Sequence, residues 1–380
     1  MFKILAMKEF KAGKYIRQGS YKSFQPEKIN RQWFIDNMEL LTLLSQADRQ
    51  LGRLDMYSEY IPNIDMFISM HVLKEATQSS KIEGTETNIE EALLEKEDIL
   101  AEKRDDWEEV QNYIAALNSA ITSLEKLPFS SRLIKQTHEI LLQGVRGKHK
   151  LPGEFRTSQN WIGGASINDA VFIPPIQTSI NEFMSDLENF AHNDDFFFPD
   201  LLKIALIHYQ FETIHPFLDG NGRVGRLMIT LYLVEKGILK KPILYLSDFF
   251  ERNRNLYYDN LTRVREKDDI LQWFKFFLVG IIETSKKGIS TFDSILKLQK
   301  EVDSKIQKLG SRANNAKVLM NYLYQHPMVE AQRAKEVTKL SLPSVYKLLE
   351  ELEKLEIIKE ITGSKRGKLY LFRDYTKLFY

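Results

Sequence analysis

Apolar residues recur at helical spacing along most of the chain, and this pattern predicts a mainly α-helical protein. One helix is expected over about 65–83. It ends at Gly84, a residue suited to the left-handed position that follows a helix. Residues 1 to about 60 have a mixed pattern in which aromatic and basic residues are interleaved. Other helices are expected at about 105–124, 131–142, 247–266 and 269–309.

Two segments are apolar on nearly every side, which is typical of helices buried in a core. The first, DLLKIALIHYQFETI, follows Pro199 and is stopped by Pro216, because a proline cannot continue a helix. The second, RVGRLMITLYLVEKG, begins after a Gly-Asn-Gly turn and ends at Gly237. The polar stretch HPFLDGNGRVGR at 215–226 therefore joins two buried helices.

Residues 151–175, LPGEFRTSQNWIGGASINDAVFIPP, break the helical pattern. They are rich in glycine, asparagine, threonine and aromatic residues, contain a Gly-Gly turn and close on two prolines. This composition predicts an irregular hairpin or flap.

The pattern changes again after about residue 310. Three helices and a final hairpin around TGSKRGK are expected, and this order is typical of a winged helix–turn–helix domain. Residues 311–380 include 13 basic and 8 acidic side chains, a net charge of +5. The predicted organisation is an N-terminal extension over 1–60, a helical core over 61–300 and a winged helix over 311–380.

Composition narrows the classes of function. The 380 residues include 53 Lys and Arg against 52 Asp and Glu, and a net charge of +1 favours no polyanionic partner for the whole chain. The chain has no cysteine, which excludes disulfides, thiolate zinc sites and a cysteine nucleophile. No apolar run approaches the ~20 residues that span a bilayer, and the N-terminus lacks the apolar core of a signal peptide. We expect a cytoplasmic protein with no membrane partner.

The stretch 215–226 gathers residues that suit phosphate chemistry. The N–H groups of a Gly-Asn-Gly turn can form a nest for anions, and the helix that follows adds positive potential. Arg223 and Arg226 oppose the helix dipole there, a local cost that a bound polyanion would offset. Asp219 is a hard oxygen ligand suited to Mg²⁺, and His215 can accept a proton near neutral pH. Taken singly, these residues also fit a core histidine, an ordinary turn or a solvated arginine, so the interpretation depends on their combination.

This stretch resembles the signature of the Fic family, H-P-F-x-D-G-N-G-R-x-x-R, at every fixed position. The resemblance implies an all-helical Fic-fold core that transfers AMP from ATP to a hydroxyl side chain of a target protein, releasing pyrophosphate. It implies that His215 is the base for that hydroxyl and that Asp219 binds Mg²⁺. Glu212, one helical turn before His215, is expected to orient it or to approach the ribose. The implied nucleotide-binding residues in the motif are Gly220, Asn221, Gly222, Arg223, Val224, Gly225 and Arg226.

A second stretch, SSKIEG at 79–84, resembles the inhibitory pattern of the family, S/T-x-x-x-E-G/N. Ser79 and Glu83 are four residues apart, hence on one helix face, and Gly84 follows them. By itself this short pattern fits simple surface charge. Beside the longer motif it predicts that Glu83 reaches Arg226 and occupies the guanidinium needed for the γ-phosphate of ATP.

Two further segments resemble parts of the same family. The flap resembles a β-hairpin over the active site, whose edge can pair with an extended target segment and present the acceptor side chain. The segment ERNRNLYYDNLTRVREKDD resembles the region that closes over the adenine, with Tyr258 as the expected ring contact and Tyr257 behind it. In some relatives an asparagine follows seven positions after that tyrosine, and here the position is Arg265.

Several functions stay open at the level of the sequence. The leading hypothesis is an autoinhibited protein adenylyltransferase that modifies Tyr, Thr or Ser of a target or of itself, and the resemblance favours a homodimer. The alternatives are a winged-helix DNA-binding regulator with a nucleotide-sensing Fic domain, an enzyme with another donor, and a de-AMPylase. A winged helix often binds DNA, but here three glutamates crowd the expected recognition helix around 341–355. DNA binding and a role in dimerisation or target docking are therefore equal alternatives. The candidate DNA contacts are Ser344, Lys347, Lys365, Arg366 and Lys368.

Overall fold

The structure is a computed structural model that describes residues 5–6, 9–61, 63–144, 149–195, 197–363 and 367–380. The chain is mainly helical, as the periodicity predicts. The helices are α1 (Met38–Tyr60), α2 (Asp65–Ile82), α3 (Ile89–Ala92), α4 (Arg104–Ser123), α5 (Ser131–Leu141), α6 (Ile180–His192), α7 (Asp200–Ile214), α8 (Asn221–Glu235), α9 (Ser247–Arg252), α10 (Arg254–Lys267), α11 (Ile270–Gln307), α12 (Ala313–Gln325), α13 (Ala331–Thr338), α14 (Leu342–Lys354) and α15 (Arg373–Thr376). The strands are β1 (Leu5–Ala6), β2 (Gly13–Gln18), β3 (Tyr21–Pro26), β4 (Trp33–Phe34), β5 (Met328–Glu330), β6 (Lys359–Glu360) and β7 (Leu369–Leu371). No helix in these ranges is both as long and as apolar as a transmembrane segment has to be.

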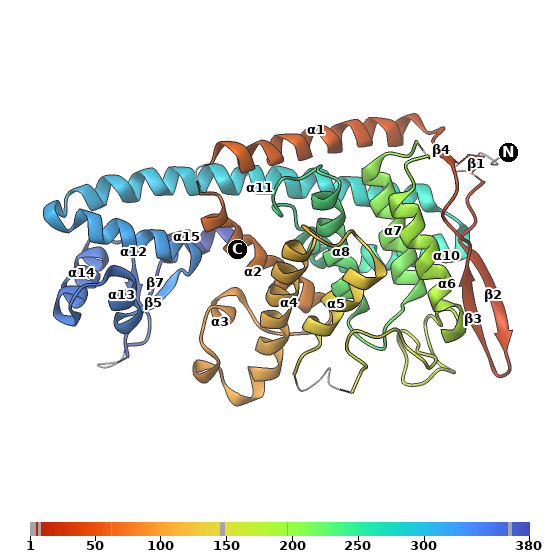
Figure 1. Cartoon of the computed structure of the whole chain (residues 1–380), viewed down its shortest axis with the longest axis horizontal. Helices are drawn as coiled ribbons and strands as arrows, with labels where there is room; N and C mark the ends of the chain where they lie inside the picture. The colour runs from red at the N-terminus through yellow and green to blue at the C-terminus, as the bar shows by residue number, and fades with distance from the viewer. Residues whose placement is uncertain (1–4, 7–8, 62, 145–148, 196, 364–366) are drawn as a thin grey trace.

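Helices α7 and α8 occupy the middle of the molecule, among α2, α4, α5 and α6 (Figure 1). Every residue of α7 after Asp200 is buried, and so is every residue of α8 from Arg223 to Leu233. Such complete burial matches the all-round apolar character of both sequences. Two helices fixed on all sides therefore hold the two ends of the loop that carries the motif.

Both ends of this loop have left-handed backbone. His215 has φ 49° and ends α7 just before Pro216, and Gly220 has φ 74° immediately before the first residue of α8. A left-handed histidine is uncommon, because the Cβ atom of any residue but glycine is crowded in that conformation. The strain indicates that the surrounding structure fixes the position of His215.

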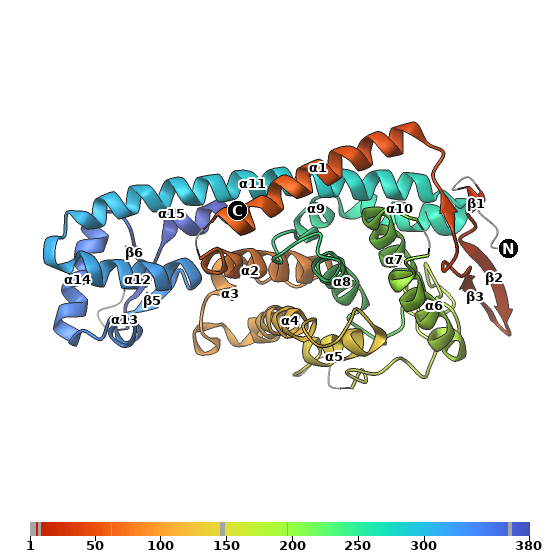
Figure 2. The same ribbon diagram turned by 45° about the horizontal axis from the view of Figure 1, so that its top comes forward.

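The N-terminal residues contain more regular structure than their mixed pattern indicates. Helix α1 runs along α11, and the β2–β3 hairpin lies at the end of the molecule opposite to α12–α14 (Figures 1 and 2). Asn37 caps α1, since its Oδ1 accepts a hydrogen bond from Leu40 N at 2.8 Å. Only one face of α1 is buried, so its many polar residues conceal the helix in the sequence.

The helix expected over 247–266 is two helices, α9 and α10. Asn253 between them has φ −115° and ψ 32°, which are not helical values, and its Nδ2 donates to Phe249 O at 2.9 Å. A side chain that binds the preceding helix in this way competes with the regular backbone pattern. The break redirects the chain so that α10 approaches the end of α7.

The C-terminal residues form α12, α13 and α14 with a three-stranded antiparallel sheet in the order β5-β7-β6. The sequence predicts only the β6–β7 hairpin, and the short strand β5 between α12 and α13 adds the third strand. The assignment of a winged helix stays a prediction. Two of its candidate DNA contacts, Lys365 and Arg366, lie outside the described residues.

Candidate active site

Asn221 closes the loop between α7 and α8. Its Oδ1 accepts a hydrogen bond from Phe217 N at 2.8 Å, and its Nδ2 donates to Phe217 O at 2.9 Å. Asp219 Oδ1 accepts from Gly220 N at 2.6 Å. Val224 N donates to Gly220 O and begins the helical hydrogen bonds of α8. The loop is therefore a defined turn that ends at the N-terminus of α8, where backbone N–H groups favour an anion.

Two residues of the flap segment hold this loop from outside. The Arg156 side chain is buried, and its Nε donates to His215 O at 2.9 Å while its Nη2 donates to Pro175 O at 2.5 Å. Asn160 Nδ2 donates to Phe217 O at 2.9 Å. The sequence does not single out Arg156, because an arginine that binds backbone carbonyl groups cannot be told from a solvated one by its sequence position. From the sequence, only a docking role is expected for this segment.

His138 of α5 supports the loop from a third side. Its Nδ1 accepts a hydrogen bond from Gly153 N at 2.9 Å, so its Nε2 carries the proton and donates to Asp219 O at 3.0 Å. The imidazole stacks on Phe217 with ring centroids 3.7 Å apart. Burial lowers the pKa of His138 to about 4. The sequence does not single out His138 either, because a single histidine in an amphipathic helix is typical of an ordinary core position.

His215 is held as a neutral base. Burial lowers its pKa to about 4, and the positive charges of Arg265 and Arg156 act in the same direction. The Nδ1 atom is buried without a hydrogen-bond partner among the described residues. A neutral imidazole can accept a proton at neutral pH.

Glu212 lies one turn before His215 and is buried against α8. A Cβ atom on Gly225 would come within 2.3 Å of Glu212 Oε1, so glycine is the residue that lets this carboxyl approach the helix. Burial raises the pKa of Glu212 to about 7, and the Oε1 atom has no partner within the described part of the chain. Glu212 contacts α8, and no hydrogen bond from its carboxyl to His215 is present between these described residues.

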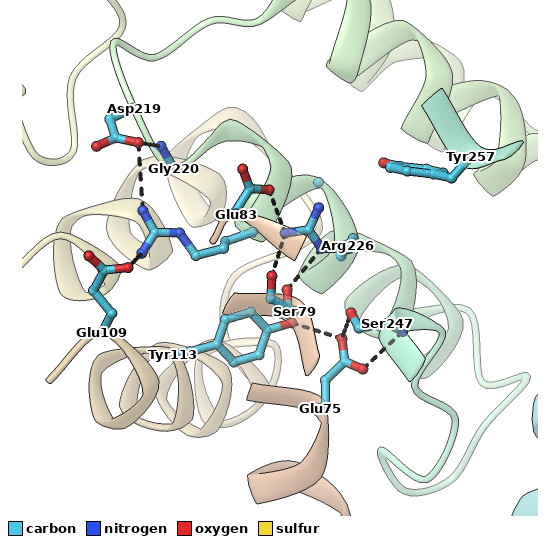
Figure 3. Close-up of polar contacts among 12 residues, drawn as sticks. Glu75, Ser79, Glu83, Glu109, Tyr113, Asp219, Gly220, Arg226, Ser247 and Tyr257 are labelled. Carbon is cyan, nitrogen blue, oxygen red and sulfur yellow. Dashed lines mark hydrogen bonds and ion pairs between the residues drawn. The ribbon is translucent and has the colours of Figure 1, made fainter. Parts of the chain in front are cut away.

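Two of the three guanidinium nitrogens of Arg226 bind the end of α2 and its capping residue Glu83 (Figure 3). Arg226 Nη2 donates to Glu83 Oε1 at 2.7 Å and to Ser79 O at 2.9 Å, and Arg226 Nε donates to Ser79 Oγ at 2.9 Å. The contact between Glu83 and Arg226 that the sequence predicts is therefore present. Burial alone would raise the pKa of Glu83, but the Arg226 guanidinium outweighs it and holds this pKa below its usual range.

The Glu83 carboxylate also lies against the start of α8. A Cβ atom on Gly222 would come within 2.2 Å of Glu83 Oε1. Gly84 follows with φ +104°, where α2 has ended and the chain turns away. The carboxylate of Glu83 thus takes the place beside Gly222 and Arg226 that the sequence predicts for a phosphate.

A buried polar cluster one turn further down fixes α2 (Figure 3). Glu75 Oε1 accepts from Tyr113 Oη at 3.0 Å and from Ser247 Oγ at 2.5 Å, and Glu75 Oε2 accepts from Ser247 N at 3.1 Å. Glu75, Ser79 and Glu83 are spaced by four residues and share one face of α2. The hydrogen bonds of Glu75 therefore set the position of the face that meets Arg226.

Arg223 points to other partners than Arg226. Its Nη1 donates to Glu109 of α4 at 3.1 Å, and its Nη2 lies 3.6 Å from Asp219 Oδ1. The Asp219 side chain is 44% exposed, and the described residues contain no group of three potential metal ligands. One accessible carboxylate fits Mg²⁺, which commonly binds through one or two protein carboxylates together with substrate phosphates.

The two tyrosines of α10 differ in their surroundings. Tyr257 is buried, and its hydroxyl donates to His208 Nε2 at 2.9 Å, because His208 Nδ1 donates its proton to Gly225 O at 2.9 Å. Tyr258 is 40% exposed. Partial burial raises the pKa of its hydroxyl, the nearby Glu83 carboxylate raises it further, and the Arg226 guanidinium opposes the shift. Tyr257 thus joins α7, α8 and α10, while the ring of Tyr258 is accessible.

Comparisons with known proteins match two parts of the chain to family descriptions. Residues 41–122 match "Fic/DOC family N-terminal" and residues 128–233 match "Fic/DOC family". A "Protein adenylyltransferase Fic" of Aedes aegypti is 32% identical over 33% of this chain and 22% of its own length. A "Probable protein adenylyltransferase" of Aquifex aeolicus is 25% identical over 80% of this chain and 96% of its own length. The chain thus spans about a fifth of the insect relative and nearly all of the bacterial one.

Solved structures agree on the fold. A Fic family protein from Desulfovibrio desulfuricans superposes with a TM-score of 0.56 at 20% identity, over 89% of this chain and 97% of that one. A Fic domain containing signaling protein from Bacteroides thetaiotaomicron superposes with a TM-score of 0.52 at 19% identity, over 65% of this chain and 95% of that one. At such identities the likeness shows the fold alone.

Proposed function

Since the chain belongs to the Fic/DOC family, we propose that it is an autoinhibited protein adenylyltransferase that moves AMP from ATP to a protein hydroxyl group. The observation that carries this proposal is the placement of Glu83 between Arg226 and Gly222. A carboxylate in an anion site of this kind stands where a phosphate oxygen would bind.

The triphosphate of ATP would bind at the N-terminus of α8. Gly220 supplies the left-handed turn, Gly222 leaves room beside the helix, and Arg226 offers a guanidinium for the terminal phosphate. Tyr258 provides an accessible ring for the adenine, and Tyr257 supports it from within the core. Glu212, buried against Gly225, is proposed to support the helix start that binds the ribose and phosphates.

His215 is the proposed catalytic base. The acceptor oxygen attacks the α-phosphorus, the bond from that phosphorus to the pyrophosphate oxygen breaks, and His215 takes the proton of the hydroxyl. Asp219 would hold Mg²⁺, which supplies positive charge for the phosphates when bound. Arg156 and Asn160 keep the His215 loop in place, since a misplaced base loses much of its effect.

Inhibition follows from competition for Arg226. While Glu83 holds the guanidinium at 2.7 Å, the γ-phosphate of ATP lacks this partner, and the negative charge of Glu83 repels it. The neutral His215 and the loop are already in place, so release of Glu83 is the change that activates the enzyme.

The test is transfer of label from α-³²P-ATP with Mg²⁺ in wild type, Glu83→Gly and Glu83→Gly/His215→Ala. We expect strong labelling of protein by Glu83→Gly, at least about tenfold above wild type, and a loss of about 10²-fold or more in the double variant, the usual contribution of a general base. ATP binding, measured by calorimetry, should persist in the double variant. Wild-type labelling equal to that of Glu83→Gly would contradict autoinhibition.

We also propose that the protein modifies itself, forms a homodimer and is cytoplasmic. For the C-terminal residues, α14 carries Glu350 paired with Lys354, and Glu351 is paired with Arg312. Because the glutamates of α14 add negative charge that repels a polyanion, we propose that these C-terminal residues serve docking or dimerisation.

A further inference from the structure

The N-terminal hairpin lies beside the flap. Phe24 N of β3 donates to Ile173 O at 2.8 Å, the Phe24 ring lies 5.8 Å from the Phe172 ring, and Tyr15 of β2 packs edge-on against Phe24 at 5.1 Å. Ile162 and Phe172 form the antiparallel bridge of the flap. The strand of the flap around residues 171–173 therefore has Ile162 on one edge and β3 on the other.

The contact between β3 and the flap is incomplete. In the register of the hairpin, Tyr15 pairs with Phe24 and Arg17 pairs with Lys22, around a two-residue turn. In such a hairpin the backbone groups of Lys22 point to the same outer edge as those of Phe24. Between the described residues, Phe24 alone of these two makes a backbone hydrogen bond to the flap. Beyond Phe24 the edge is open.

A pocket lies between the open edge of β3 and the flap. It has a volume of about 320 Å³ and is lined by Tyr15 and Lys22 of the hairpin and by Ala170, Val171, Phe172 and Ile173 of the flap. Tyr15 is 46% exposed and Val171 is 76% exposed. Apolar walls with exposed backbone edges suit an extended peptide segment.

The charge of the pocket is positive on the hairpin side. Paired residues project to the same face, so Arg17 and Lys22 lie on the face of Tyr15, while Lys14 lies on the opposite face. No acidic partner of Arg17 or Lys22 is present in the described ranges, and both are exposed. Burial raises the pKa of the Tyr15 hydroxyl, and the charges of Arg265 and Glu266 shift this pKa in opposite directions.

The pocket is adjacent to the proposed catalytic site through Arg265. The Arg265 guanidinium lies 3.9 Å from the centre of the Phe172 ring. Its Nη2 donates to Glu212 O at 3.3 Å, and its Nε donates to Thr213 Oγ1 at 3.2 Å, in the last turn before His215. Arg265 thus links the Phe172 wall of the pocket to the last turn before the base.

We propose that the β2–β3 hairpin and the flap together bind an extended, acidic segment of the target protein, with an acidic side chain directed to Lys22 and Arg17. This inference rests on the proposed AMP transfer and adds a substrate class to it. The flap presents the acceptor, and the hairpin selects the residues that flank it.

The experiment uses the full chain as Glu83→Gly and three derivatives that add Lys22→Glu, Arg17→Glu or Lys14→Glu. The probes are acetylated nine-residue peptides with a central Tyr, Thr or Ser and flanking residues that are acidic, basic or neutral, labelled with α-³²P-ATP. Lys14→Glu is the matched control, because it makes the same change of charge on the opposite face of the same hairpin.

We expect the parent and the Lys14→Glu derivative to label acidic peptides about fivefold faster than basic ones. Lys22→Glu and Arg17→Glu should each lose or reverse this preference, since attraction between exposed charges becomes repulsion. A preference unaffected by Lys22→Glu, or affected equally by Lys14→Glu, would overturn the inference. Self-labelling of the enzyme without labelling of any peptide would also overturn it while AMP transfer stands, and absence of all label would refute the proposed function itself.

Discussion

His215 illustrates how single residues around the site fix its chemistry. Its backbone is left-handed, Arg156 binds its carbonyl group, and burial with two nearby arginines keeps its imidazole neutral. None of these features is needed for a histidine that only fills the core. The histidine is therefore in the protonation state of a base before any substrate arrives.

Substitution of Arg265 tests whether nearby positive charge helps to keep the imidazole of His215 neutral. In Arg265→Met the positive charge near His215 is lost, so the pKa of His215 should rise from about 4 toward its ordinary value. More His215 is then protonated as the pH falls. The acid limb of the pH–rate profile of the Glu83→Gly enzyme should shift to higher pH, with a rate at pH 6 that is lower by up to about fourfold, the limit set by a pKa of 6.5.

Arg265→Lys is the control, because it keeps the charge and loses the stacking on Phe172. It should retain the pH profile of the parent even if the rate falls. An unchanged acid limb in Arg265→Met would show that this arginine only supports the flap.

Substitutions of Ser79 and of its neighbour Ser80 test how much the hydrogen bond to Arg226 contributes to inhibition. Ser79 Oγ accepts a hydrogen bond from Arg226 Nε at 2.9 Å, whereas the neighbouring Ser80 Oγ is buried with no partner among the described residues. Ser79→Ala should raise transfer by about tenfold or more, because loss of a hydrogen bond to a charged group weakens the inhibited state by about 1.5 kcal/mol or more. Ser80→Ala should leave the rate of label transfer unchanged, and equal activation by both would point to general loosening of α2.

At the scale of elements, two helices of this chain approach each other through a glycine. Gly288 of α11 faces Leu54 of α1, and a Cβ atom there would come within 2.9 Å of Leu54 Cδ1. Gly52 on α1 has nothing within 4 Å of the same position. The two glycines therefore differ in role although both lie inside long helices.

Alanine substitutions should separate these roles by the free energy of unfolding. Gly288→Ala is expected to be about 1–3 kcal/mol less stable than Gly52→Ala, because both gain the helix preference of alanine but only Gly288→Ala overpacks against Leu54. Gly52→Ala is expected to stabilise the protein by about 0.5–1 kcal/mol, because alanine favours the helix and the space is free. Urea denaturation of both variants measures the difference. A stabilising Gly288→Ala would mean that α1 does not pack this closely on α11.

At the scale of the whole molecule, the C-terminal residues are joined to α2. His71 of α2 packs between Phe292 of α11 and Phe379 near the C-terminus, with ring centroids 4.8 and 5.0 Å apart. Phe67 of α2 lies against Tyr324 of α12 at 5.3 Å. The helix that ends at Glu83 therefore also makes the contacts to α12 and to the C-terminal residues.

This junction should make stability depend on pH. Burial, with Lys74 nearby, lowers the pKa of His71 to about 3, while a histidine in the unfolded chain titrates near 6.5. Between these values only the unfolded state binds the proton, so stability is lost as the pH falls below about 6.5. His71→Phe should reduce the slope of unfolding free energy between pH 6 and 4 by about 1.4 kcal/mol per pH unit.

The exposed His149 supplies the comparison for that measurement. Denaturation of His149→Phe at the same pH values should give the slope of the wild type. If His71→Phe and wild type had equal slopes, His71 would be accessible to protons in the folded protein.

The sequence by itself determined the helical class, the two buried helices and the loop between them, because all-round apolar segments and a proline–glycine turn have few alternatives. It also predicted the contact of Glu83 with Arg226, since the spacing of four residues and a family pattern pointed to it. Only the tertiary structure decided which distant groups support the loop. Arg156, His138 and Arg265 bind backbone carbonyl groups of residues far away in the chain, and such contacts leave no periodic signal in sequence. The same holds for the pocket between hairpin and flap, whose walls are more than 140 residues apart and meet only when the chain is folded.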